Sequence, residues 1–278
     1  MTDVNWSPGP AWLFCPADRP ERYAKALTAA DVVILDLEDA VAPANKAAAR
    51  DALRGLVADR LFLADRTMVR INAADSPHHY LDVRLAADLG LPRLMLAKTE
   101  DVHSVAALAH DIMVLLETPK GVERAGELTG AANVIGAMWG ADDLVAGLGG
   151  TASRRPDGTY RDVARFARSR VLVAAKAHGR LALDAVHMDI DDLTGLAAEC
   201  DDATAIGFDA TVAIPPKQIS TIRASYSPAA ERIEWAQRLL AHAGEDRGVT
   251  TFEGRMVDGP IYAQAERVLR LAALTGDH

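Results

Sequence analysis

The sequence predicts an α/β protein that forms a (β/α)8 TIM barrel with a C-terminal helical extension. Short apolar runs alternate with longer amphipathic stretches over most of the 278 residues, which is typical of repeated strand and helix units. Eight such runs occur, the number that closes this barrel. The first strand-to-helix turn, at residues 15–20, contains no glycine. It therefore lacks the dinucleotide-binding turn that would favour a doubly wound open sheet.

The predicted barrel domain covers residues 1–226. Its strands are apolar runs of four or five residues at 12–15, 32–36, 68–71, 93–97, 113–116, 134–138, 181–185 and 210–214. Each run is followed by a stretch whose apolar residues have helical spacing. We therefore expect helices at 19–30, 44–57, 79–89, 101–110, 122–128, 160–178, 193–206 and 217–225.

Residues 227–278 are predicted to form a separate helical extension. Two helical stretches, 228–243 and 259–274, flank a charged segment that contains several glycines. Each stretch has an apolar face, and the barrel repeat offers nothing that would cover it. Because exposed apolar faces commonly mark protein contacts, we expect the extension to pack against a neighbouring subunit.

Charge and cysteine content restrict the class of protein. The chain has 30 Lys+Arg against 39 Asp+Glu, and a net charge of −9 argues against a nucleic-acid partner. Cys15 and Cys200 are too few for a disulfide framework or a multi-thiolate zinc site. No uncharged apolar run approaches the roughly 20 residues of a membrane helix. Residues 1–10 lack the features of a signal peptide, so we expect a cytoplasmic protein without a membrane partner.

Polar side chains follow several predicted strands, at the end where a TIM barrel has its active site. They are Asp36, Glu38 and Asp39 after the second strand, Arg70 and Asn72 at the third, Lys98 after the fourth, Glu117 after the fifth, and Asp142 and Asp143 after the sixth. Four or more carboxylates at one opening repel one another, and a divalent cation stabilises such a group. Oxygen ligands without His or Cys favour Mg²⁺ or Mn²⁺.

Each of these side chains also has an alternative interpretation. A strand-end carboxylate commonly caps the next helix, but Thr118 is the better cap after Glu117 and leaves that carboxylate available. Arg70 lies within an apolar run and needs an anionic partner, for which a protein carboxylate and a substrate carboxylate are equally suitable. His187 follows the seventh strand and is a weaker candidate. A basic loop within residues 153–161 either binds phosphate or is solvated.

Six sequence blocks together resemble the citrate lyase beta-subunit-like proteins of the HpcH/HpaI aldolase superfamily. They read FCPADRPE at 14–21, DLEDAV at 36–41, VRIN at 69–72, LET at 116–118, WGADDL at 139–144 and MVDGP at 256–260. The chain is most similar to stand-alone members that act as 3-hydroxyacyl-CoA lyases. The resemblance implies a homotrimeric, Mg²⁺-dependent barrel. It would cleave citramalyl-CoA or malyl-CoA to acetyl-CoA and a 2-keto acid, pyruvate or glyoxylate.

The resemblance also implies a metal site. Glu117 and Asp143 match the family's direct metal ligands. Glu38 and Asp39 match carboxylates that hold the waters around the metal. Either Glu38 or one of those waters would take the proton from the substrate hydroxyl.

Four further residues match family positions near the substrate. Arg70 is similar to the arginine that faces the reacting substrate, where it would neutralise an enolate oxygen. Arg19 and Lys98 resemble positions close to the thioester or CoA. Asp258 resembles an aspartate that the tail of a neighbouring subunit delivers over the metal. It would transfer the proton at the thioester α-carbon.

Two departures from the family pattern and three alternative functions remain. Pro215 stands where the eighth strand commonly has histidine, and Ala97 precedes Lys98 where proline is common.

The first alternative is the beta subunit of a citrate lyase complex, which acts on a citryl carrier-protein thioester. The second is an aldolase of free 2-keto-acid aldols, and the third is a non-catalytic barrel that binds CoA thioesters.

Overall fold

A computed structural model describes residues 6–244 and 247–276 of the protein. Eight parallel strands close into a barrel in chain order, which confirms the predicted fold class. They are β1 (Ala11–Pro16), β2 (Val32–Asp36), β3 (Thr67–Ile71), β4 (Arg93–Leu96), β5 (Asp111–Leu116), β6 (Val134–Trp139), β7 (Leu181–Asp184) and β8 (Ala210–Ala213). The C-terminal ends of these strands form the mouth of the barrel, and their N-terminal ends form its floor.

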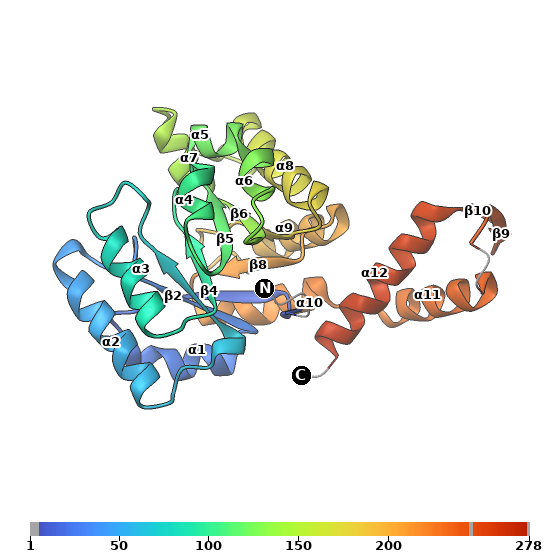
Figure 1. Cartoon of the computed structure of the whole chain (residues 1–278). Coiled ribbons are helices and arrows are strands. Elements are labelled where there is room, and N and C mark those ends of the chain that lie inside the picture. The colour runs from blue at the N-terminus through green and yellow to red at the C-terminus, as the bar shows by residue number, and fades with distance from the viewer. Residues whose placement is uncertain (1–5, 245–246, 277–278) are drawn as a thin grey trace.

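Helices surround the barrel, and two of them project from it (Figure 1). Those of the barrel are α1 (Tyr23–Ala29), α2 (Lys46–Ala58), α3 (His79–Asp88), α4 (Val102–Ala106), α5 (Pro119–Glu123), α6 (Ala125–Thr129), α7 (Ala141–Gly147), α8 (Asp162–Ala177), α9 (Leu193–Ile206) and α10 (Ile219–Tyr226). The projecting pair is α11 (Ala230–Ala243) and α12 (Gly259–Thr275). Within the described parts of the chain, no helix is long and apolar enough to cross a membrane.

The strands are apolar on both faces because their side chains alternate between the barrel interior and the helix layer. In β2, Val32 and Ile34 belong to the interior cluster, whereas Val33 and Leu35 pack in the cluster beneath the helices. Methionines from four strands fill much of the interior: Met68, Met95, Met113 and Met138. Gly136 makes room for one of them, since a Cβ there would lie 2.7 Å from Cε of Met113.

The predicted helix at 101–110 is too long. Helix α4 ends at Ala106, and His110 lies outside a helix. The amide Nδ2 of Asn133 donates to the carbonyl oxygens of Val105, at 2.9 Å, and Leu108, at 2.8 Å. These carbonyls are therefore satisfied without further helical turns.

Two other helical predictions need correction near β5 and β6. The single helix expected at 122–128 is two helices, α5 and α6, which meet at Arg124. The Arg124 guanidinium donates to the carbonyl oxygen of Glu100 at 2.8 Å. After β6, the unpredicted helix α7 has Asp142 and Asp143 in its first turn, where the helix dipole favours carboxylates.

The apolar faces of the two extension helices cover each other, and packing of the extension against a neighbouring subunit stays a prediction. Ala236 and Leu239 of α11 pack with Tyr262 and Ala265 of α12 in a separate buried cluster. The segment between the helices contains an unpredicted antiparallel hairpin, β9 (Thr250–Phe252) and β10 (Arg255–Val257). Its turn residues, 253 and 254, both have positive φ, as a tight two-residue turn requires.

The extension forms an arm, here defined as residues 230–244 and 247–276, that is attached at one end. In the middle of α12, Arg267 donates to the carbonyl oxygen of Phe208 and pairs with Asp209 at 3.3 Å. Leu271 joins the main core of the barrel. Figure 1 shows β9 and β10 at the opposite end of the arm, away from the barrel. The start of α12 is therefore held outside its own barrel.

Replacement of Leu239 by alanine should loosen the arm without unfolding the barrel. Leu239 is fully buried in the arm cluster, and such a truncation costs about 2–4 kcal/mol. Hydrogen exchange should therefore accelerate in α11 and α12 and remain slow in β1–β8. Leu61, which is 58% exposed, provides the matched control Leu61→Ala. Equal acceleration in the barrel strands would show that the arm is not a separate packing unit.

Candidate active site

Lys98 joins the ends of four strands at the mouth. Its Nζ lies 2.5 Å from Oε1 of Glu38, 2.8 Å from Oδ2 of Asp39 and 3.7 Å from Oδ1 of Asp143. Its backbone N–H donates to Oε1 of Glu117 at 3.1 Å. The residue adopts φ = +47°, a conformation that non-glycine residues rarely occupy. The predicted strand-end residues after β2, β4, β5 and β6 are thus brought together.

Arg70 faces a carboxylate of the protein, which answers the question that the sequence left open. Its Nε and Nη2 donate to the two carboxylate oxygens of Asp36 at 2.7 and 2.5 Å. Its Nη1 lies 3.4 Å from Oε2 of Glu38, and the guanidinium carbon lies 4.5 Å from the centre of the Phe14 ring. Asp36 is fully buried, so this bidentate pair fixes the arginine beneath the mouth.

The turn after β2 is held from below by a residue that the sequence analysis missed. Nζ of Lys46 donates to the carbonyl oxygens of Leu37 and Glu38, both at 2.7 Å, and to Oδ1 of Asn72 at 2.9 Å. The signal was present, because Lys46 lies on the same helical face as Ala49 and Leu53, which are fully buried. A lysine on an apolar helix face needs acceptors inside the protein.

Glu117 is the most strongly perturbed carboxyl group at the mouth. Its pKa is raised to about 8, chiefly by burial and also by the charge of Asp143, while Arg70 and Lys98 oppose this shift. As predicted, Thr118 caps the following helix by accepting from the backbone N–H of Gly121 at 3.1 Å. A side chain at Gly140 would collide with Glu117, since its Cβ would lie 2.9 Å from Oε2.

The other carboxylates are already partly neutralised by the protein. Burial raises the pKa of Glu38, although Arg70 and Lys98 lower it. Burial also acts to raise the pKa of Asp39, but the hydrogen bond and charge of Lys98 outweigh it and lower the pKa. Asp142 instead accepts from Oγ of Ser153 at 2.6 Å. The expected set of four or more mutually repelling carboxylates is therefore reduced to Glu117 and Asp143.

These two carboxylates fit a magnesium site of low protein coordination. In the residues that the structure describes, no group of three or more His, Cys, Asp or Glu side chains is placed to hold a metal. Mg²⁺ commonly takes one or two protein carboxylates and completes its shell with water and substrate. A cation beside Glu117 would also relieve the repulsion from Asp143 that raises the pKa of Glu117.

Two of the residues that the family resemblance places near the substrate lie outside this cluster. Arg19 is exposed after β1 and takes part in none of the contacts above. Asp258 immediately precedes α12, next to β10, and therefore lies at the end of the arm away from its own barrel (Figure 1).

The weaker candidates are engaged elsewhere. Nδ1 of His187 lies 2.8 Å from Oε2 of Glu199. In the basic loop, Arg154 pairs with the same Glu199 and stacks on Tyr160 at 3.8 Å, and Arg155 lies 3.1 Å from Asp162. Carboxylates of the protein thus pair with both of these arginines.

A closed parallel barrel with its charged side chains at the C-terminal ends of the strands defines the chain as a TIM-barrel protein of the enzyme type. The chain belongs to the HpcH/HpaI aldolase/citrate lyase family, whose model matches residues 11–216. This confirms the resemblance predicted from the six sequence blocks.

Relatives support the same assignment over nearly the whole chain. A citrate lyase subunit beta-like protein of Mycobacterium tuberculosis is 53% identical over 265 residues, 95% of this chain and 96% of that protein. A (3S)-malyl-CoA thioesterase of Cereibacter sphaeroides is 31% identical over 270 residues, 94% of this chain and 93% of that protein. The crystal structure of M. tuberculosis CitE with magnesium, acetoacetate and coenzyme A has a TM-score of 0.89. It is 52% identical, and the match covers 96% of this chain and 99% of that chain.

Glu117→Gln should change the pH dependence of stability when a chelator is present. The folded-state pKa of Glu117 is raised from 4.5 to about 8, so its contribution is favourable at low pH and is lost as the pH rises through that interval. Glutamine does not ionise. The variant should therefore gain about 2–5 kcal/mol relative to the wild type between about pH 5 and pH 8.5. Urea unfolding measures this difference.

The exposed carboxyl of Glu123 provides the matched control Glu123→Gln, which should show the same pH dependence as the wild type. A difference between Glu117→Gln and the wild type that does not vary with pH would contradict the raised pKa.

Proposed function

We propose that the protein is a Mg²⁺-dependent carbon–carbon lyase that cleaves a 3-hydroxyacyl-CoA of the citramalyl-CoA or malyl-CoA type. The products are acetyl-CoA and a 2-keto acid, pyruvate or glyoxylate. The observation that carries this proposal is the buried carboxyl of Glu117 beside Asp143, at a mouth that also holds Arg70 and Lys98. The names of the M. tuberculosis and C. sphaeroides relatives, and the ligands in the CitE structure, support the choice of metal and thioester.

The carboxylates of Glu117 and Asp143 would hold the Mg²⁺ ion. When bound, Mg²⁺ supplies Lewis-acid stabilisation of the negative charge that develops on the substrate oxygens. The glycine at position 140 keeps the space beside Oε2 of Glu117 open. Lys98 orients both sides of this site, since its backbone contacts Glu117 and its side chain lies near Asp143.

Cleavage requires one proton to leave the substrate hydroxyl and another to reach the thioester α-carbon. Glu38 is suited to take the first, because its raised pKa makes it a stronger base than an ordinary carboxylate. When the bond between the α- and β-carbons breaks, its electron pair moves into the thioester enolate. Arg70 would stabilise that charge through the guanidinium nitrogen that faces Glu38, an effect worth a few kcal/mol.

The remaining roles concern binding and the second proton. Asp39 would hold waters at the site together with Glu38, and Lys98 and Arg19 would interact with the thioester or the CoA portion. Asp258 would protonate the enolate carbon from the arm of a neighbouring subunit in a homotrimer. The position of Asp258 at the projecting end of the arm supports this role.

The thioesterase name of one group of relatives favours a second candidate function, hydrolysis of the same class of thioester. The two reactions are distinguished by their products. A lyase acting on malyl-CoA releases glyoxylate and acetyl-CoA, whereas a thioesterase releases malate and free CoA.

Initial rates with (S)- and (R)-citramalyl-CoA and malyl-CoA should reveal one substrate whose cleavage is abolished by chelator. Keto acid, acetyl-CoA, hydroxy acid and free CoA are measured together. Glu117→Gln and Asp143→Asn should each weaken Mg²⁺ binding at least tenfold and reduce turnover by roughly two orders of magnitude or more. Asp142→Asn is the matched control, because the Asp142 carboxylate is bonded to Ser153.

Wild-type turnover in Glu117→Gln or Asp143→Asn would contradict the ligand assignment. Free CoA with hydroxy acid would identify the thioesterase. Absence of turnover with every thioester would favour the carrier-protein subunit or the non-catalytic barrel. Activity on free keto-acid aldols would favour the simple aldolase.

A mixture of two inactive variants should recover activity if Asp258 acts between subunits. Asp258→Asn and Glu117→Gln chains are co-expressed in equal amounts, so that they assemble at random into oligomers. About one site in four would then combine an intact Glu117 with an intact Asp258 from its neighbour. The mixed protein should have up to about a quarter of wild-type turnover. If Asp258 acted within its own chain, no site would hold both residues, and the mixture would remain inactive.

A further inference from the structure

A separate cavity lies at the floor of the barrel, on the side where the arm is attached. Its volume is about 480 Å³, within the range of about 300–1,000 Å³ of small-molecule sites. The barrel side is lined by residues at or near the beginnings of β4 to β8 and by residues 6–8 before β1, and the arm side by the C-terminal half of α12. The proposed catalytic site is at the opposite ends of the same strands.

The lining of this floor cavity is strongly basic. Its charged side chains are Arg93, Lys176, Arg180, Arg267 and Arg270, with the carboxylates Asp111 and Asp209. This composition leaves an excess of three positive charges. The cations come from both bodies that meet here, since two arginines lie on α12 and the other cations lie on the barrel.

The carboxylate of Asp209, where α12 meets the barrel, already interacts with two of these cations. Asp209 pairs with Lys176, lies 3.3 Å from Nη1 of Arg267, and accepts from the backbone N–H of Ala182 at 2.8 Å. Burial lowers the pKa of Lys176, and Arg267 and Arg270 lower it further, against the opposing effect of Asp209. The cations therefore repel one another even with this carboxylate in place.

Two guanidinium groups have unused hydrogen-bonding capacity. The Nε atoms of Arg180 and Arg267 are buried and have no hydrogen-bond acceptor among residues 6–244 and 247–276. Nη2 of Arg180 has only a long contact, 3.5 Å, to the carbonyl oxygen of Ala131. Guanidinium groups in such a setting match the oxygens of a phosphoryl group.

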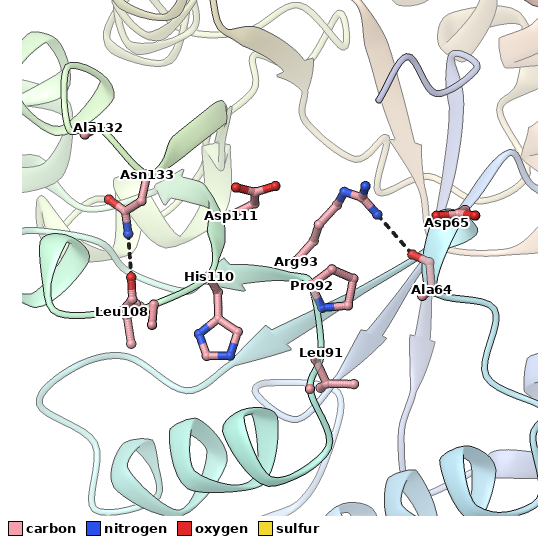
Figure 2. A pocket seen from close by; sticks show the side chains of 12 residues that line it. Ala64, Asp65, Leu91, Pro92, Arg93, Leu108, His110, Asp111, Ala132 and Asn133 are labelled. Carbon is pink, nitrogen blue, oxygen red and sulfur yellow. Dashed lines mark hydrogen bonds between the residues drawn. The ribbon is translucent and has the colours of Figure 1, made fainter. Parts of the chain in front are cut away.

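A larger cavity of about 840 Å³ adjoins this one but does not share its charge (Figure 2). It has Arg93 and Asp111 in common with the floor cavity, and adds Asp65 and His110. Burial lowers the pKa of His110, which favours the neutral ring. Figure 2 shows the guanidinium of Arg93 directed to the carbonyl oxygen of Ala64. An anion is therefore favoured only in the cavity beside α12.

We propose that the floor cavity binds a small phosphate-type polyanion that bridges the barrel and the arm. The anion would interact with Lys176 and Arg180 on the barrel and with Arg267 and Arg270 on α12. Neutralisation of these charges removes the repulsion across the attachment and stabilises the arm in its observed position. This site is independent of the proposed lyase activity.

The test uses the full-length protein and tripolyphosphate, at constant ionic strength, with calorimetric binding and thermal unfolding as readouts. The wild type should bind one tripolyphosphate per chain and unfold at a higher temperature when it is bound. Arg180→Gln/Arg270→Gln should weaken binding roughly 10- to 100-fold. Arg84→Gln/Arg165→Gln, which removes two exposed arginines elsewhere, should bind within about twofold of the wild type.

Unfolding temperatures without anion establish that the variants are folded, and the single variant Arg270→Gln replaces the double variant if the latter is not. Nucleoside triphosphates tested in parallel distinguish a nucleotide from an inorganic polyphosphate, since only the former would gain affinity from its base and sugar. The proposal is overturned if tripolyphosphate shows no saturable binding up to about 10 mM, or if Arg180→Gln/Arg270→Gln binds it as tightly as the wild type.

Discussion

The chemistry of the mouth depends on how two cations, Arg70 and Lys98, are distributed among five carboxylates. Arg70 is committed to Asp36 through two hydrogen bonds, and its third nitrogen lies 3.4 Å from Glu38. Loss of one partner from a buried pair of this kind leaves an uncompensated charge and typically costs about 3–5 kcal/mol. The arginine therefore cannot also neutralise Glu117 by direct contact, and that carboxyl group is left beside Asp143 with a raised pKa.

A second set of contacts keeps this distribution of charge fixed. Lys46 holds the backbone of the turn after β2, and Asn72 links it to Asp82, which accepts from Asn72 at 2.5 Å and from Arg50 at 2.9 Å. The four side chains of this network, those of Lys46, Asn72, Asp82 and Arg50, are buried and hydrogen-bonded to one another. A turn that is anchored in this way keeps Glu38 within reach of both Arg70 and Lys98, so the carboxylate that we propose as the proton acceptor is positioned without support from a ligand.

The sequence allows the barrel to be predicted because the evidence for each strand is local. A short run such as residues 32–36 is apolar on both faces, which is typical of a buried parallel strand. Helix ends are less predictable when a distant residue determines them, as Asn133 does for α4. The same division applies to the site. Its carboxylates are recognisable as residues that follow strands, whereas their pairing is not, since Lys98 and Glu38 are 60 positions apart. The hairpin β9–β10 had a weaker signal, because its turn pair Glu-Gly is less typical than Asn-Gly.

The arm joins two distant parts of the molecule through a single helix. Helix α12 is fixed at the floor by Arg267 and Leu271, and the nine residues from Asp258 to Arg267 correspond to about 14 Å of helix. Since a helix is stiff over this length and α11 packs along it, Asp258 is held well away from the attachment point. The mouth of the same barrel lies at the other ends of the strands, so an aspartate in this position is suited to a site on a different chain. The repulsion among the cations at the floor thus acts on α12, the helix that would position Asp258.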